Sequence, residues 1–222
     1  MSTVRQRVTE QELRRALVAW LAPRLAADDL LVEELGIENG MARVDVAQVG
    51  RSLCGFEIKS DFDTLDRLAH QMHAYHRVFD ALTIITTAAF VPQVTLLLPP
   101  WWGILQADRD AAGEVALSEV RPATANPRQE PESIAALLWR DEAALMLQEN
   151  LGAKVASSAK RAKLYRQLAD LAELATLRDW VVAALRARTS LRERDLRRVR
   201  SADPVAGPSG RDDGLRRLAA MS

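Results

Sequence analysis

The chain has 222 residues, enough for one domain of ordinary size and an appendage. Its hydrophobic content of 48% and charged content of 27% are normal for a soluble globular protein. A single cysteine, Cys54, excludes an internal disulfide. Residues 1–120 hold 11 basic and 17 acidic residues, and residues 121–222 hold the remaining 19 and 13, so the net charge of zero hides an acidic half and a basic half.

Neither the start of the chain nor its apolar runs indicate export or a membrane. Residues 1–11 are polar and lack the apolar segment of a secretory signal. The longest apolar run, residues 81–98, is interrupted by Pro92 and is too short and broken for a membrane span. We therefore expect a cytoplasmic protein that has no membrane partner.

The first expected elements are a helix and a strand. Thr9 and Glu12 form a capping box that predicts a helix reaching about Leu25. Residues 30–35 are apolar at first and end in Glu33, Glu34 and Leu35, which predicts a strand that stops at a glycine.

Residues 42–49 and 53–60 predict two adjacent strands that carry an acid–acid–lysine pattern. Asp45, Glu57 and Lys59 have the spacing D-x11-E-x-K. Because side chains alternate along a strand, Glu57 and Lys59 share one face with Gly55, and the other face is apolar and suits a covering helix. A three-residue loop over 50–52 would place Asp45 opposite Glu57, whereas a two-residue loop would turn Asp45 to the wrong face. A shared site therefore requires the longer loop.

These three side chains suit a magnesium-dependent phosphodiesterase. Carboxylates bind a hard cation through oxygen, and a lysine faces the attacking water and the charge that develops on the phosphate. The alternative is that Glu57 and Lys59 are solvent-facing residues of an ordinary amphipathic edge strand.

A second helix is expected to begin at Asp63 as its cap. Its apolar residues follow the spacing of a core-facing stripe: Leu65, Leu68, Met72, Tyr75 and Phe79. The three histidines, His70, His73 and His76, lie away from this stripe, and we interpret them as surface residues rather than zinc ligands. The β-branched segment 81–87 predicts a buried strand parallel to the one that holds Glu57, because a helix joins the two.

The remainder is expected to be a short helix or a strand near 92–98, two further strands near 101–105 and 115–120, and then helices. Three prolines mark residues 121–131 as a linker. Helical patterns cover 133–150, 158–174 and 177–188, the last with Thr176 as its N-cap. We expect residues 201–222 to form a disordered tail. The expected division is a core over 1–120, the linker, and a basic helical extension over 132–200.

The order helix, strand, hairpin, helix, strand, with acids on the hairpin, resembles the PD-(D/E)XK, or restriction-endonuclease-like, nuclease superfamily over residues 9–107. Gln71 and Tyr75 also fit Q-x-x-x-Y, which resembles the RecB-like and resolvase-like branch. The chain departs from the superfamily motif at its opening proline, since Val44 precedes Asp45. It also resembles a small group of uncharacterised stand-alone bacterial proteins, for which the resemblance implies a fold but no biological role.

The resemblance implies an α/β fold: a restriction-endonuclease-like α-β-α core with a mixed sheet, followed by an α-helical C-terminal extension. It implies Mg²⁺ or Mn²⁺ bound by Glu34, Asp45, Glu57 and the Ile58 carbonyl. It further implies catalysis by Asp45, Glu57 and Lys59, assisted by Gln71 and Tyr75; Tyr75 has an alternative role as a core residue, because it lies in the apolar stripe.

Two functions stay open at this point. The first is a metal-dependent nuclease that cleaves DNA, in repair or in defence. The second is a catalytically inactive nuclease-fold module that binds nucleic acid or a protein. Residues 154–200 carry 13 basic and 5 acidic residues, which predicts a surface for a nucleic-acid backbone, with a solvated helix face as the alternative. A further alternative is that the C-terminal helices bind a protein partner or a second copy of the chain in a homodimer.

Overall fold

The computed structural model describes residues 6–201, with side chains placed for residues 6–188. The expected tail therefore lies outside the described residues. Residues 1–186 form one compact unit, and residues 187–222 form a second, of which the structure describes a helical backbone as far as Ser201. No helix among the described residues is long and apolar enough to cross a membrane.

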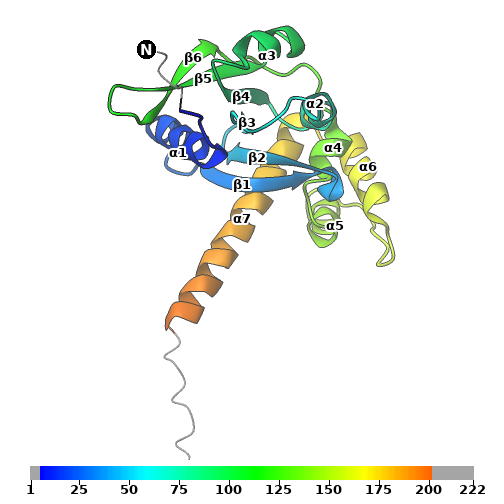
Figure 1. Cartoon of the computed structure of the whole chain (residues 1–222). Coiled ribbons are helices and arrows are strands. Elements are labelled where there is room, and N and C mark those ends of the chain that lie inside the picture. The colour runs from blue at the N-terminus through cyan, green and yellow to red at the C-terminus, as the bar shows by residue number, and fades with distance from the viewer. Residues whose placement is uncertain (1–5, 202–222) are drawn as a thin grey trace, which may run out of the picture. The chain divides into compact units, whose positions relative to one another are not determined.

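The protein has an α/β fold built on a six-stranded mixed sheet, whose strands lie in the order β1-β2-β3-β4-β5-β6 (Figure 1). Strands β3, β4 and β5 are parallel to one another, and the other pairs are antiparallel. The strands are β1 (Leu30–Ile37), β2 (Ala42–Val49), β3 (Leu53–Lys59), β4 (Ala81–Thr87), β5 (Gly103–Arg109) and β6 (Val115–Arg121). The helices are α1 (Glu10–Leu21), η1 (Ala22–Arg24), η2 (Glu38–Gly40), α2 (Leu68–His76), α3 (Val91–Leu97), α4 (Pro131–Ala135), α5 (Arg140–Glu149), α6 (Arg161–Leu171) and α7 (Leu174–Ser201).

Helix α1 covers one face of the sheet (Figure 1). Its apolar stripe, Leu13, Leu17 and Leu21, packs in one cluster with Phe56 and Ile58 of β3. The capping box of Thr9 and Glu12 is formed as expected. The helix ends at Leu21 rather than near Leu25, because Pro23 lacks the N–H that would continue the helical bonding and the chain turns through η1.

The other face of the sheet packs against α2 and the C-terminal helices. Buried residues of α2, α4, α5, α6 and the first part of α7 join the strand residues in one hydrophobic cluster. Arg178 of α7 also donates to Asp80, just before β4, at 2.5 Å. Within residues 1–186 the basic helices therefore supply part of the core of the sheet.

The expected hairpin and the expected parallel strand are confirmed. Val49 pairs with Leu53, so the loop has the three residues 50–52, and β4 is parallel to β3. The expected short helix after Pro92 is α3.

Other helix boundaries were also predicted wrongly. Helix α2 begins at Leu68, because the Asp63 carboxylate instead accepts hydrogen bonds from the backbone and hydroxyl of Ser60. The expected helix over 133–150 is two helices, α4 and α5, because the backbone of Trp139 is extended and its N–H donates to the Glu142 carboxylate as the N-cap of α5. Helix α7 begins at Leu174, so Thr176 lies inside it and is not its N-cap.

Candidate functional site

Three carboxylates lie at the same level of the sheet, on three neighbouring strands. The register of β1 with β2 aligns Glu34 with Asp45. The register of β2 with β3, continued by one residue, aligns Asp45 with Glu57. The three-residue hairpin loop thus produces the alignment that a shared site requires.

The sheet is irregular at this level. Glu34 has a φ of 56°, in the left-handed region, and the pairs on either side of it form while Glu34 and Asp45 do not pair. Residues three apart in a regular strand face opposite sides. Here two such residues in each strand pack in the same cluster: Val32 and Leu35 in β1, and Val44 and Ala47 in β2. The alternation of side chains is therefore interrupted at Glu34 and Asp45, without a shift in the register of the two strands.

The irregularity directs Asp45 toward the neighbouring strand. Its carboxylate accepts a hydrogen bond from the backbone N–H of Ile58 at 2.7 Å. Burial and the adjacent charge of Glu57 raise the pKa of Asp45 to about 7, against the opposing hydrogen bond from Ile58. Asp45 is therefore protonated more readily than an ordinary carboxyl group, and a cation that binds it would displace that proton.

Behind Asp45, strand β3 and helix α2 form a buried polar network. The Lys59 ammonium lies 2.7 Å from the Glu57 carboxylate and 3.2 Å from Gln71 Oε1. The Tyr75 hydroxyl lies 2.8 Å from the other Glu57 oxygen and accepts a hydrogen bond from Gln71 Nε2 at 3.3 Å. Only 1% of Glu57 and 7% of Lys59 is exposed, so the pair is largely desolvated, and Gln71 and Tyr75 contact it from α2. Burial and the charge of Glu57 also raise the pKa of Tyr75, which keeps the hydroxyl protonated.

Helix α1 adds two charged residues that the sequence did not assign to the site. Arg14 donates to the backbone carbonyl of Asp45 at 2.9 Å and pairs with Glu34 at 2.9 Å and Glu10 at 2.7 Å. Oxygens of Glu10, Glu34 and Asp45 all lie within 4.8 Å of one another. Their spacing of four residues on the first helix indicates an ion pair between Glu10 and Arg14, but not that the pair lies at this site.

The site opens into a pocket of about 630 Å³. Its walls include the acids Glu10, Glu34, Asp45 and Glu57, and the cations Arg43, Lys59 and Arg67 with the imidazole of His70. The structure thus brings Glu34, Asp45, Glu57, Ile58, Lys59 and Gln71 to one pocket, with Tyr75 directly behind. An all-carboxylate donor set of this kind fits a hard cation such as Mg²⁺ or Mn²⁺.

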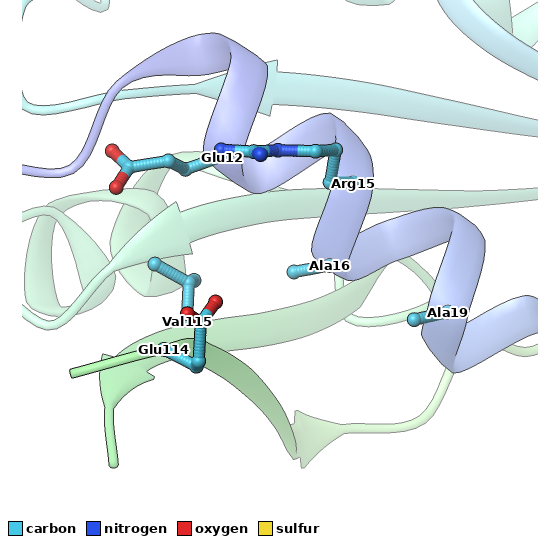
Figure 2. A pocket seen from close by; sticks show the side chains of 6 residues that line it. All are labelled: Glu12, Arg15, Ala16, Ala19, Glu114 and Val115. Atoms are coloured by element: carbon cyan, nitrogen blue, oxygen red, sulfur yellow. The ribbon is translucent and has the colours of Figure 1, made fainter. Parts of the chain in front are cut away.

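A smaller pocket of about 220 Å³ lies between α1 and the start of β6 (Figure 2). One of its two acids, Glu12, accepts the capping hydrogen bond of Thr9 and pairs with Arg109 at 2.8 Å. Chiefly the Thr9 N–H, together with Arg109, lowers the pKa of Glu12 to about 2. The Glu12 carboxylate is thus committed to capping α1 and joining it to β5.

One histidine does not lie where the sequence predicted. His70 and His73 are exposed as expected, but His76 is buried and accepts a hydrogen bond from the Trp102 indole at 2.9 Å. The expectation failed because the C-terminal end of α2 is covered on a further side: Asn126 donates to the His76 carbonyl at 2.6 Å. Trp102 is buried and Trp101 is half-buried.

The family model of bacteriophage P4 protein cII matches residues 4–203 of the chain. Protein cII of Enterobacteria phage P4 is 37% identical over 87 residues, which are 39% of this chain and 33% of that protein. The chain thus matches about a third of the length of this curated relative. A protein of unknown function from Silicibacter pomeroyi is structurally similar at a TM-score of 0.44 and 19% identity, over 89% of this chain and 97% of its own. Since the family model covers most of the sequence, the chain belongs to the bacteriophage P4 protein cII family.

Proposed function

We propose that this protein is a metal-dependent nuclease with a restriction-endonuclease-like core, which hydrolyses phosphodiester bonds of DNA. The observation that carries the proposal is the alignment of Glu34, Asp45 and Glu57 across three strands, with Lys59 at 2.7 Å from Glu57. The sequence pattern alone does not require these residues, which lie on three different strands, to line one pocket.

In this proposal Glu34, Asp45, Glu57 and the Ile58 carbonyl hold Mg²⁺ or Mn²⁺, and Glu10 is an additional carboxylate within reach of the same position. The cation, when bound, would polarise the phosphate and lower the pKa of a water molecule. The buried Lys59 stabilises the negative charge that grows on the phosphate oxygens as the water oxygen bonds to phosphorus and the leaving oxygen departs.

Gln71 and Tyr75 act as positioning residues. Gln71 accepts a hydrogen bond from Lys59, and Tyr75 holds the oxygen of Glu57 that faces away from Lys59. Their four-residue spacing places both side chains on the same side of α2, so one helix fixes the lysine and its partner acid together.

The test is cleavage of plasmid and single-stranded DNA with Mg²⁺ or Mn²⁺, comparing the wild type with Asp45→Asn and Lys59→Ala. We expect both variants to lose at least about a hundredfold in rate, the usual effect of removing a charge-stabilising group. Glu149→Gln, an exposed acid on α5, is the matched control and should cut like the wild type. Equal cleavage by folded Asp45→Asn and wild type would refute the assignment.

A second function, an inactive nuclease-fold binding module, is favoured by one observation. Both oxygens of Glu34 are already paired with arginines, one with Arg14 at 2.9 Å and the other with Arg43 at 2.5 Å. These guanidinium groups would balance the acids without a metal. Thermal unfolding with millimolar Mg²⁺ or Mn²⁺ separates the two functions, because only a protein that binds the ion in its native state gains stability.

A further inference from the structure

The reacting groups of the proposed site lie at the bottom of a pocket and not on an open surface. Glu57 is 1% exposed and Lys59 7% exposed, beneath a pocket of about 630 Å³. A pocket of that size is in the range of sites that enclose a small ligand. A phosphate in a stiff duplex is flanked by stacked base pairs, whereas a single strand bends and its bases move apart.

Two side chains on the rim of this pocket have no partner in the part of the chain that the structure describes. Arg67 and His70, at the start of α2, are exposed, line the pocket, and make no side-chain hydrogen bond or ion pair there. The other cations of the pocket are engaged: Lys59 with Glu57, and Arg43 with Glu34. Arginine is suited to holding a phosphate, and an imidazole N–H donates to one whether or not the ring is charged.

We infer that the pocket accepts a single strand of DNA, and that Arg67 and His70 hold the phosphate next to the one placed at Lys59. This inference rests on the proposed nuclease function, since it names the substrate form of the same site. Contacts of this kind fix the register of the strand without reading its sequence.

The test measures binding apart from cleavage. Fluorescence anisotropy in EDTA, at several salt concentrations, compares a labelled oligothymidylate with a blunt duplex of equal length. Arg67→Ala should weaken binding of the single strand about fivefold and reduce its dependence on salt by about 0.7 log units per log unit of salt. His70→Ala should weaken binding in the same direction.

Two matched controls remove the same groups elsewhere. Arg51→Ala removes an exposed arginine from the β2–β3 loop, and His73→Ala removes an exposed histidine of the same helix that does not line the pocket. Both should bind like the wild type. The inference is overturned if Arg67→Ala weakens binding of the duplex as much as binding of the single strand, or if Arg67→Ala and Arg51→Ala bind the single strand alike.

Failure of the inference about the pocket can be told apart from failure of the proposed nuclease function. A wild type that prefers the single strand through Arg67, yet cleaves nothing with Mg²⁺ or Mn²⁺, supports the inference about the pocket and removes the nuclease. A wild type that cleaves DNA while Arg67→Ala keeps full affinity supports the nuclease and removes the inference.

Discussion

Asp45 lies where burial and a neighbouring carboxylate both oppose its charge, so its pKa rises to about 7 from an ordinary 3.8. The native state consequently holds this proton more firmly than the unfolded chain. Asp45 therefore contributes most to stability below about pH 4, and its contribution falls as the pH rises to about 7 and is constant above. Binding of a cation has the opposite dependence, because it requires the deprotonated form.

The prediction is that Asp45→Asn gains stability relative to the wild type as the pH rises from about 5 to about 8. Asparagine has an oxygen that accepts the Ile58 N–H but carries no charge to desolvate. Thermal melts of both proteins across this range, without metal, measure the difference. Asp28→Asn, at an exposed acid, serves as the control. A difference in melting temperature that stays constant with pH would show that Asp45 does not titrate in this way.

His76, the last residue of α2, is buried, and its protonation also affects stability. Its Nε2 accepts from Trp102, which requires the neutral ring, and burial with the nearby charge of Arg128 lowers its pKa to about 4. The lowered pKa means that the unfolded chain binds the proton more readily, so stability from this residue is complete above about pH 6.5 and decreases as the pH falls toward 4.

We expect His76→Phe to lower the free energy of unfolding at about pH 7 by about 1–3 kcal/mol, because the buried Trp102 N–H loses its acceptor. On acidification from about pH 7 to about pH 5, the same variant should lose less further stability than the wild type. Urea denaturation at the two pH values measures both effects, with His70→Phe as the exposed control. A wild type and a variant that lose equal stability on acidification would contradict the role given to His76.

At the scale of elements, the irregularity that β1 and β2 share at Glu34 and Asp45 positions the site. Several elements were predictable because they follow local chemistry, such as the capping box of α1 and the β-branched strand β4. The length of the β2–β3 loop was not, since two or three residues were both possible and only a shared site required three. The irregularity was not predictable either, since nothing in the residues around Glu34 and Asp45 marks an interruption of the alternation. Glu10 and Arg14 were missed for a related reason, because sequence pattern does not reveal how α1 lies across the sheet. The Asp63 side chain shows a local competition, in which a turn at Ser60 replaced a helix cap.

The left-handed backbone of Glu34 gives a test of this irregularity. Glycine adopts such a conformation freely, whereas alanine is strained. Both substitutions remove the pairs with Arg14 and Arg43, so Glu34→Gly should be more stable than Glu34→Ala by about 1 kcal/mol. The neighbouring Glu33, which does not have a positive φ, should give the opposite order, with Glu33→Gly less stable than Glu33→Ala. Urea denaturation of the four variants measures the difference in stability between glycine and alanine at each position. The same order of stability at both positions would contradict the left-handed conformation of Glu34.

At the scale of the whole molecule, the basic helices α6 and α7 contribute both to the hydrophobic core and to a charged surface. Their inner faces belong to the core: Leu164, Leu168, Leu177 and Val181 share the hydrophobic cluster of the sheet. Their outer faces carry exposed cations such as Lys160 and Lys163. A basic surface for nucleic acid is thus attached to residues that the fold itself requires, and a truncation tests binding only where it leaves the core intact.

Residues 189–222 hold 8 basic and 5 acidic residues. A chain that ends at Arg188 keeps every core residue named above, whereas one that ends at Ala153 lacks the apolar faces of α6 and α7. We therefore expect the longer truncation product to melt like the full chain and the shorter one to have no cooperative transition. If residues 189–222 bind a DNA backbone, the product ending at Arg188 should bind duplex DNA more weakly than the full chain. Its affinity should also fall less steeply with salt, by about 0.9 log units per log unit of salt for each phosphate that it no longer neutralises. If that product keeps the affinity and the salt dependence of the full chain, residues 189–222 do not bind the DNA backbone, and they contact solvent or a protein partner instead.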